Sequence, residues 1–265
     1  MEIEGRTVMI TGGGSGMGLA ATRMLARCGA KVCLLGRRLE QIESQAKAVG
    51  GLSIQCDVSD EASLEQAFDE LESRCGHASI LIHAAASGRM LPLISADGRA
   101  TDRALMRQVI ETNVLGTLYS NQIFAERLSQ HVNKSADVKG VIINVSSIGA
   151  IDGVVGASYV ASKAAVNGLA LTLAREFSDL GIRVMAIAPG GIDTPMFREG
   201  ANEATHTLIA ESVPALKRTG TPEEFASLVK HICENDYLNG SVVRLDGGMR
   251  IPFVNNVGKD SNSVN

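Results

Sequence analysis

A tyrosine and a lysine four positions apart offer the clearest chemistry in this sequence. Tyr159 and Lys163 lie in a stretch of helical pattern, so their side chains should share one helix face about one turn apart. A free phenol has a pKa of about 10, and lowering it to about 7 takes about 4 kcal/mol. One ammonium group about 4 Å away, at an effective dielectric constant of 20, supplies about that much. The pair is therefore suited to trade a proton with a substrate oxygen near neutral pH.

Two serines precede this pair, directly after an apolar strand expected at 140–145. Ser146 and Ser147 should lie at the sheet edge where open α/β sheets hold ligands. A serine hydroxyl there can polarise a carbonyl oxygen while a hydride reaches the carbon, and Tyr159 can supply the proton. The YxxxK spacing also arises by chance, with a core tyrosine beside a surface lysine. Together with a glycine loop near the N-terminus, the serines favour an oxidoreductase of carbonyls and alcohols.

That glycine loop reads TGGGSGMG over residues 11–18 and follows an apolar run at 7–11. A pyrophosphate needs a tight turn, close approach of the backbone and helix N–H groups aimed at its charge. A glycine-rich turn alone is weak support, but here a strand precedes it and a helical pattern begins near Met17. The loop therefore predicts dinucleotide binding at five positions: Gly12, Ser15, Gly16, Met17 and Gly18.

The residues after the second expected strand bear on the choice of cofactor. A dinucleotide fold reads the adenosine ribose about 20 residues beyond the glycines, where an acid would favour NAD(H). This sequence has Gly36, which leaves room, followed by Arg37 and Arg38, which can pair with a 2′-phosphate. The alternative is that both arginines are solvated charges of the next helix. We favour NADP(H) over NAD(H).

Short apolar runs alternate with longer stretches of helical period along the chain. The runs are β-branched and do not alternate strictly with polar residues, which indicates strands covered on both faces of a parallel sheet. They occupy 7–11, 31–35, 52–56, 79–83, 140–145, 183–188 and 241–245, and helical patterns occupy 17–28, 39–49, 60–75, 103–131, 158–179 and 222–234. Ser59 or Asp60, and Thr221 before Pro222, mark two helix starts. The order predicts an α/β fold with a doubly wound, parallel, seven-stranded Rossmann sheet.

Length and composition set the remaining boundaries. The 265 residues are 45% hydrophobic and 20% charged, with no linker, so we expect one domain over 1–253 and a polar tail at 254–265. The net charge of −4 and the scattered basic residues argue against nucleic acid or a membrane as partner. Five cysteines show no ligand spacing, so no metal site is expected and a reducing compartment is indicated. Without a leader pattern, the cytoplasm is the expected location.

The motifs together resemble the short-chain dehydrogenase/reductase family over nearly the whole chain. They are TGGGSGMG, Asn113-Val114-Leu115-Gly116, the strand end Asn144-Val145-Ser146-Ser147, YVASK at 159–163, and Pro189-Gly190. The resemblance implies that Tyr159 is the acid/base and that Lys163 lowers its pKa and holds the nicotinamide ribose. It also implies that Ser147 orients the substrate oxygen and that Asn113 anchors a water molecule leading protons to solvent.

Further cofactor contacts follow from the same resemblance. Asp57 would contact the adenine and Thr194 the carboxamide, and the remaining contacts would come from Val58, Ala84, Pro189, Gly190 and Ile192. The family resemblance also implies a homo-tetramer built on helices 103–131 and 158–179 and the C-terminal strand. A substrate lid is expected at about 193–217.

Within the family, four stretches are similar to the short-chain 3-hydroxyacyl-CoA dehydrogenase subgroup, also called type 10 17β-hydroxysteroid dehydrogenases. They are GVIINVSS, GIRVMAIAPGGIDTPM, LNGSVVRLDGGMR and residues 88–107. Three departures stand out. Gly36 replaces an acid, and the segment between Ser147 and Tyr159 is one residue shorter, which leaves Ser146 as a rival to Ser147. His83-Ala84-Ala85-Ala86 replaces Asn-Asn-Ala-Gly, and His83 is expected to be a hydrogen-bonded structural substitute.

The resulting hypothesis is an NADP(H)-dependent oxidoreductase that moves a hydride between nicotinamide and a secondary alcohol or ketone. The expected small-molecule substrate carries an apolar group of acyl or steroid-like character. One alternative is an NAD-dependent 3-hydroxyacyl-CoA dehydrogenase. An alternative of another class is a non-catalytic dinucleotide sensor or scaffold, which would typically have lost the tyrosine or lysine.

Overall fold

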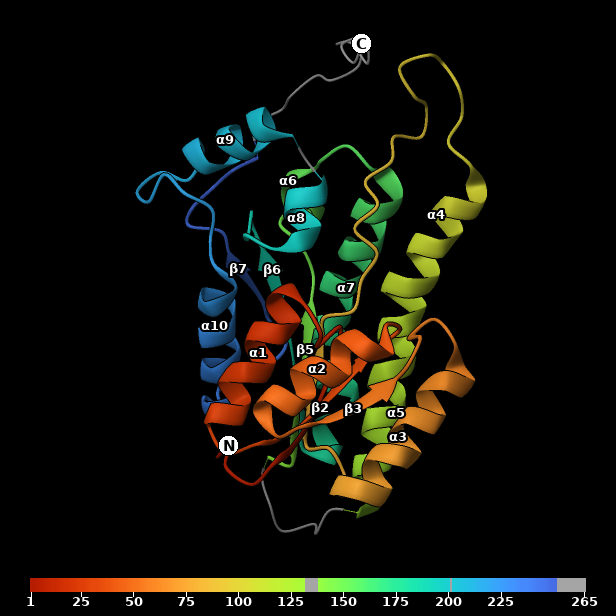
Figure 1. Cartoon of the computed structure of the whole chain (residues 1–265), viewed down its shortest axis with the longest axis vertical. Helices are drawn as coiled ribbons and strands as arrows, with labels where there is room; N and C mark the ends of the chain where they lie inside the picture. The colour runs from red at the N-terminus through yellow and green to blue at the C-terminus, as the bar shows by residue number, and fades with distance from the viewer. Residues whose placement is uncertain (132–137, 201, 252–265) are drawn as a thin grey trace.

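A parallel sheet of seven strands forms the centre of the molecule (Figure 1). The computed structural model describes residues 1–131, 138–200 and 202–251, so the predicted tail at 254–265 lies outside the described residues. The strand order is β3-β2-β1-β4-β5-β6-β7. The strands are β1 (Thr7–Thr11), β2 (Lys31–Gly36), β3 (Leu52–Gln55), β4 (Ile80–His83), β5 (Gly140–Val145), β6 (Ile182–Pro189) and β7 (Val242–Leu245). The predicted Rossmann sheet in a single domain is confirmed.

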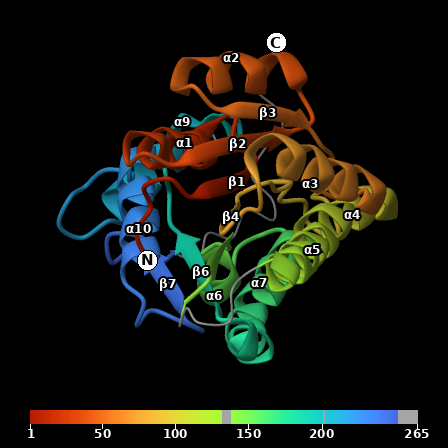
Figure 2. The ribbon, with the colours of Figure 1, turned by 90° about the horizontal axis from the view of Figure 1, so that it is seen from below.

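Helices cover both faces of this sheet, as the end-on view in Figure 2 shows. One face carries α3 (Glu61–Cys75), α5 (Gly116–His131) and α7 (Ala157–Glu176), and the other carries α1 (Gly16–Arg27), α2 (Leu39–Val49) and α10 (Pro222–Glu234). Because the chain order reverses between β1 and β4, a crevice opens at the carboxyl ends of these strands. Among the described helices, none combines the length and apolarity needed to cross a bilayer.

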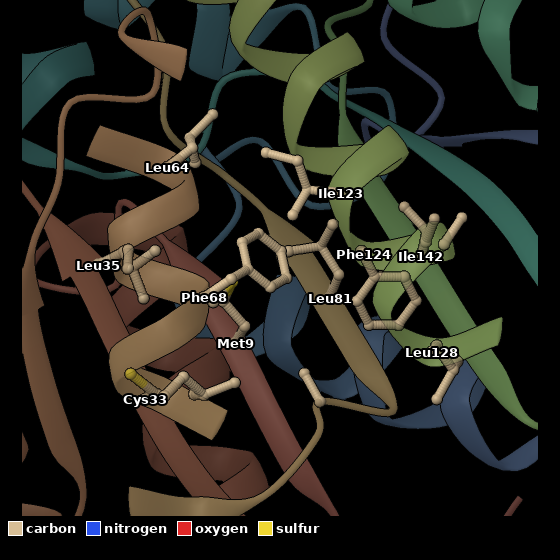
Figure 3. Packing of buried hydrophobic residues seen from close by; sticks show 14 of the residues in the cluster. Met9, Cys33, Leu35, Leu64, Phe68, Leu81, Ile123, Phe124, Leu128 and Ile142 are labelled. Atoms are coloured by element: carbon tan, nitrogen blue, oxygen red, sulfur yellow. The ribbon is translucent and has the colours of Figure 1, made fainter. Parts of the chain in front are cut away.

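Alternation along the strands produces the two halves of the core. In β1, Val8 and Ile10 face the layer of α1, α2 and α10, whereas Met9 between them faces α3 and α5. Phe68 of α3 and Phe124 of α5 fill the second half over the sheet, both almost completely buried (Figure 3). Successive strand residues point to opposite faces, so a sheet covered on both sides needs the continuous apolar runs seen in the sequence.

Two helix starts form as the sequence predicts. The Asp60 carboxylate accepts from the N–H groups of Ala62 and Ser63, which caps α3. At α10, the Thr221 hydroxyl accepts from the Glu224 N–H while the Glu224 carboxylate accepts from the Thr221 N–H. These bonds satisfy N–H groups that would otherwise lack partners in the first turn.

The helical pattern at 103–131 is not one regular helix. It divides into α4 (Arg103–Ile110), a π-helical turn at Glu111–Leu115 and α5. Asn113 lies in the π turn and is buried. A π turn inserts extra backbone into a helix, and such turns occur frequently at functional sites.

Three short helices were not predicted. The helix α6 (Gly149–Asp152) lies between Ser147 and Tyr159, and α8 (Pro195–Gly200) and α9 (Glu203–Glu211) lie within the segment 193–217. In Figure 1 all three lie at the end of the molecule toward which the strands of the sheet point. Helices this short carry too little hydrophobic period for a sequence pattern to show them.

Candidate active site

A cleft of about 600 Å³ opens at the carboxyl ends of the central strands. Its walls come from the glycine loop, the ends of β2, β3, β4 and β5, the start of α7 and the segment before α8. Fourteen of the residues predicted to bind cofactor or catalyse line it: Gly12, Ser15, Gly16, Met17, Gly18, Gly36, Arg37, Arg38, Asp57, Val58, Ala84, Tyr159, Lys163 and Thr194. Segments far apart in the sequence thus converge on one space.

Five predicted residues do not line the cleft: Asn113, Ser147, Pro189, Gly190 and Ile192. Pro189 is buried at the end of β6, Gly190 packs against Asp246, and Ile192 is buried. Conversely, the prediction omitted several lining residues, among them Gly14, Gln41, Thr112 and Met196, and the cleft also includes Ser146, the rival of Ser147. Gly14 lies inside the quoted glycine motif and could have been included. Gln41 and Thr112 lie on helices, where nothing in the local sequence marks them.

The glycine loop has a backbone that side chains would obstruct. Gly12 and Gly16 have φ angles of +68° and +51°, in the left-handed region that favours glycine. At Gly18, a Cβ atom would lie 2.3 Å from the Gly12 carbonyl oxygen. This close approach lets α1 start directly behind the loop, so its first N–H groups can face a pyrophosphate.

The adenosine end of the cleft is open and positively charged. At Gly36 a Cβ atom would meet only the Ile42 side chain, at 3.1 Å, within 4 Å. Arg37 and Arg38 line the cleft, and neither forms an ion pair among the described residues. Gln41 reaches back from α2 and donates to the Gly14 carbonyl at 3.1 Å, which ties this end to the glycine loop.

Lys163 joins α7 to the end of β5. Its ammonium group is buried and donates to the Val145 carbonyl at 2.7 Å, while the Ser146 hydroxyl donates to the Lys163 carbonyl at 2.9 Å. Burial lowers the pKa of Lys163 to about 8, because the charged form loses its solvation. The energetic cost of deprotonating Lys163 at physiological pH is therefore smaller than for an exposed lysine.

Tyr159 lies one turn before Lys163 and lines the same cleft. Burial raises the pKa of Tyr159, and a hydrogen bond with Ser147 acts in the opposite direction. Lys163 does not contribute to this shift, so the predicted lowering of the Tyr159 pKa by the lysine is wrong, and burial of the phenol dominates. In this structure the phenol is therefore held in its protonated form.

The two serines have different partners, which distinguishes them. Ser146 is buried and its hydroxyl is used by the Lys163 carbonyl. The Ser147 hydroxyl accepts from the Gly149 N–H at 3.0 Å, and its hydrogen bond with Tyr159 favours the tyrosinate. Ser146 lines the cleft and Ser147 does not, but the bond to Tyr159 connects Ser147, rather than Ser146, to the tyrosine hydroxyl.

Asn113 lies behind the cleft and holds two of its walls together. Its side chain accepts from the Ser87 N–H at 2.7 Å and donates to the Ser87 carbonyl at 3.1 Å. It also donates to the Ser162 hydroxyl at 2.9 Å, next to Lys163. The Asn113 carbonyl accepts from Thr117 at 2.7 Å. Through these hydrogen bonds, Asn113 connects the segment after β4 to α7.

His83 is buried at the end of β4 and pairs with Thr11 across the sheet. Its Nδ1 lies 3.2 Å from the Thr11 hydroxyl, which also accepts from the Ala85 N–H at 3.1 Å. Burial, together with the positive charge of Lys163, lowers the pKa of His83 from 6.5 to about 3. The ring is therefore neutral at physiological pH, with Nδ1 paired to Thr11 and the buried Nε2 without a hydrogen-bond partner among the described residues.

The strand order, the glycine loop and the Tyr159–Lys163 pair facing one cleft define an oxidoreductase that acts on CH–OH groups with a dinucleotide fold. A family model described as enoyl-(acyl carrier protein) reductase matches residues 12–250. The chain belongs to the short-chain dehydrogenase/reductase family.

Individual relatives are similar over nearly their full lengths. A 3-hydroxyacyl-CoA dehydrogenase type-2 of Drosophila melanogaster is 34% identical, with 94% of this chain and 99% of the relative covered. The crystal structure of a 3-hydroxyacyl-CoA dehydrogenase type-2 from Mycobacterium avium is 29% identical, with a TM-score of 0.87 and coverage of 94% and 97%. A 7α-hydroxysteroid dehydrogenase complexed with NADH and 7-oxo glycochenodeoxycholic acid is 25% identical, with a TM-score of 0.84 and coverage of 94% and 95%.

The buried neutral His83 predicts a specific sensitivity to acid. Below pH 6.5 the unfolded chain binds a proton at this histidine, whereas the folded chain does so only near pH 3, so wild-type stability falls across this interval. His83→Asn removes the proton uptake and should be less acid-sensitive, by about 3 kcal/mol at pH 4 relative to pH 7. Urea unfolding at several pH values measures this. His231→Asn on the exposed face of α10 is the control, and equal acid sensitivity of wild type and His83→Asn would contradict the prediction.

Proposed function

We propose that this protein is an NADP(H)-dependent oxidoreductase that interconverts a ketone and a secondary alcohol bearing an apolar group. The observation that carries the proposal is that Tyr159, hydrogen-bonded to Ser147, and Lys163 line one end of a cleft whose other end is lined by Arg37 and Arg38. The first set suits proton transfer to a substrate oxygen. The arginines suit a cofactor phosphate.

The proposed chemistry assigns proton transfer to the protein and hydride transfer to the cofactor. When bound, the nicotinamide supplies or accepts the hydride, and its oxidised form adds a positive charge that favours the tyrosinate. In reduction, Tyr159 donates its proton to the developing alkoxide, and in oxidation it takes the proton from the alcohol. Ser147 donates a hydrogen bond to the same oxygen, and its own position is fixed by the Gly149 N–H. Lys163 lies one helical turn from Tyr159, and its positive charge would favour the tyrosinate that remains after the proton has left.

The test of this assignment is Tyr159→Phe. Removing the hydroxyl removes the acid/base group, so kcat should fall by at least 100-fold, since general acid–base catalysis contributes about 10²- to 10⁴-fold. The affinity for NADPH, measured by fluorescence titration, should stay within about twofold because the Arg37 and Arg38 end is untouched. Tyr237→Phe is the matched control, since Tyr237 is fully exposed in the turn after α10. Unchanged turnover in Tyr159→Phe would end the assignment.

The preference for NADP(H) rests on the residues that follow β2. Gly36 has no side-chain carboxylate that would repel a 2′-phosphate, and Arg37 and Arg38 are free of ion pairs among the described residues. The Arg37 carbonyl accepts from Gln55 at 3.0 Å, which holds this segment beside β3. A phosphate dianion placed there would gain charge-assisted hydrogen bonds from guanidinium groups.

Exchanging these residues should reverse the cofactor preference. Gly36→Asp with Arg37→Leu introduces an acceptor for the ribose hydroxyl and removes a phosphate partner. The kcat/KM for NADP(H) should fall by about 10- to 100-fold, matching the 1.5–3 kcal/mol of a hydrogen bond to a charged group. Steady-state kinetics with both cofactors measures this, and Arg27→Leu, exposed at the end of α1, is the charge-matched control. A wild type that already prefers NAD(H) would refute the arginine argument.

Exposed apolar side chains occur on three segments, and Met196 among them lines the cleft. They are Met90, Leu93 and Ile94 before α4, Ile151 and Val155 around α6, and Met196 and Leu208 in the segment 193–217. The segments touch one another: a Cβ atom at Gly88 would lie 2.6 Å from the Met196 sulfur, and one at Gly156 would lie 2.8 Å from the Met90 Cα. Exposed apolar groups gathered at a cleft mark a binding surface. We propose that α8 and α9 form a substrate lid over it.

Chain length of the substrate tests the apolar wall. Among ketones or β-ketoacyl thioesters of increasing length, kcat/KM should rise by up to about fourfold per methylene, since burying one CH2 contributes about 0.8 kcal/mol. Met196→Ser should flatten this rise. Leu171→Ser is the control, because Leu171 is 49% exposed against 51% for Met196 but lies on α7 beside Gly240. A length dependence that Met196→Ser leaves unchanged would exclude this wall from the substrate site.

The second candidate is an NAD-dependent 3-hydroxyacyl-CoA dehydrogenase. The relative from Drosophila melanogaster bears that enzyme's name, and the hydroxysteroid dehydrogenase structure contains NADH. Gly36 separates the two candidates, because it lacks the acid expected of an NAD site. A homo-tetramer and a cytoplasmic location remain part of the proposal.

A further inference from the structure

Asp152 and Arg244 form an ion pair outside the cleft. The Arg244 guanidinium donates to both Asp152 oxygens, Nη1 to Oδ1 at 2.6 Å and Nη2 to Oδ2 at 2.8 Å. Asp152 ends α6, which follows Ser147, whereas Arg244 lies in the edge strand β7. The pair therefore connects the loop that carries Ser147 to the last strand of the sheet.

The pair is sheltered and completed by further bonds. The side chains of Asp152 and Arg244 are only 10% and 21% exposed. Arg244 also donates to the Asp246 carboxylate at 2.7 Å and to the Met249 carbonyl at 3.0 Å, and the Ile251 N–H donates to Asp152 at 3.3 Å. Arg244 holds the pKa of Asp152 below its ordinary value, so the carboxylate is ionised at neutral pH. Such a two-pronged, partly buried pair fixes geometry in a way that an exposed pair does not.

The other end of α6 reaches the proposed catalytic serine. The Asp152 N–H donates to the Ile148 carbonyl at 2.9 Å, which closes the single turn of α6. At the start of that turn, the Gly149 N–H donates to the Ser147 hydroxyl at 3.0 Å. A shift of α6 would therefore move the donor that orients Ser147, and with it the bond from Ser147 to Tyr159.

Apolar packing also supports the contact between α6 and the segment that follows β7. Ile148 packs in a small cluster with Ala188, Val213 and Met249, separate from the two main halves of the core. Met249 supplies the carbonyl that Arg244 binds, and Val213 follows α9. The segment after β7 thus contacts both the serine loop and the base of the segment 193–217.

We propose that Asp152 and Arg244 are a positioning pair that holds α6 so that the Gly149 N–H orients the Ser147 hydroxyl toward the reacting oxygen. Neither side chain lines the cleft or touches the reacting atoms. The pair acts on the substrate side only, because the residues proposed for the adenosine and pyrophosphate lie on other segments. This inference rests on the proposed role of Ser147.

The test compares Arg244→Ala with Arg127→Ala. Arg127 is a matched control: it is 23% exposed and also pairs with several carboxylates, Glu65, Asp69 and Glu72, but it joins α3 to α5 away from the cleft. Arg244→Ala should lower kcat by about 10- to 100-fold, as expected when a misplaced group loses alignment. The Kd for NADPH should stay within twofold. Arg127→Ala should lose comparable thermal stability while keeping kcat within twofold.

Two further measurements separate positioning from general destabilisation. Added guanidinium ion, at concentrations well below those that unfold the protein, should restore at least fivefold of the lost kcat in Arg244→Ala and none in Tyr159→Phe. Amide hydrogen exchange in the peptide covering residues 147–153 should be at least tenfold faster in Arg244→Ala and unchanged in Arg127→Ala. Normal kcat in Arg244→Ala, or equal kcat losses in both arginine variants, would overturn the proposal.

Failure of Ser147 itself gives a different result. If Ser147→Ala turns over like wild type, the proposed role of Ser147 is wrong, and the positioning inference falls with it as a statement about catalysis. The exchange measurement remains informative in that case, because it reports on α6 without any turnover. Unchanged exchange at 147–153 in Arg244→Ala would show that the pair does not hold α6, whatever Ser147 does.

Discussion

The hydrogen bond from the Lys163 ammonium to the Val145 carbonyl is the contact on which the site depends. A buried cation needs a fixed acceptor, and the last residue of β5 supplies it at 2.7 Å. A second hydrogen bond joins the same two segments, because the Ser146 hydroxyl after β5 donates to the Lys163 carbonyl of α7. Because Tyr159 precedes Lys163 by one turn and Ser147 follows Val145 by two residues, this joint sets the distance between the proposed acid and the serine beside it. The proposed role of the glycine loop and α1 is then to hold a dinucleotide beside Tyr159 and Lys163, whose positions are already fixed by this contact.

Much of the fold could be predicted from the sequence because helices cover both faces of the sheet. Burial on two sides demands continuous apolar, β-branched runs, and the seven predicted strands agree with the structure to within one or two residues. Caps at Asp60 and Thr221 were legible because they are local. The break between α4 and α5 was not, since a π turn adds backbone without interrupting the apolar pattern on either side. The turn α6 is too short for any period to reveal it.

In the candidate site as well, features that depend on local interactions could be predicted, whereas features that depend on distant contacts could not. Gly12, Gly16 and Gly18 could be assigned from sequence because their role depends on their own backbone and immediate neighbours. The choice between Ser146 and Ser147 depended on how the chain turns after β5. The pKa of Tyr159 depended on burial that no spacing encodes, and the sequence argument, which weighed only the lysine charge, gave the opposite direction. The partnership of Asp152 with Arg244 spans 92 positions and leaves no local pattern.

That span has a consequence for how the enzyme comes into being during translation. At about 5–20 residues per second, a ribosome needs roughly 5 to 20 s to add the residues that separate Asp152 from Arg244. Throughout that interval a nascent chain already carries the glycine loop, β1 and β4, while the carboxylate at the end of α6 has no guanidinium to meet. The glycine loop and the strands that flank the crevice are therefore synthesised before Arg244 can hold the serine loop. Final assembly of the catalytic geometry waits for the last strand to leave the ribosome.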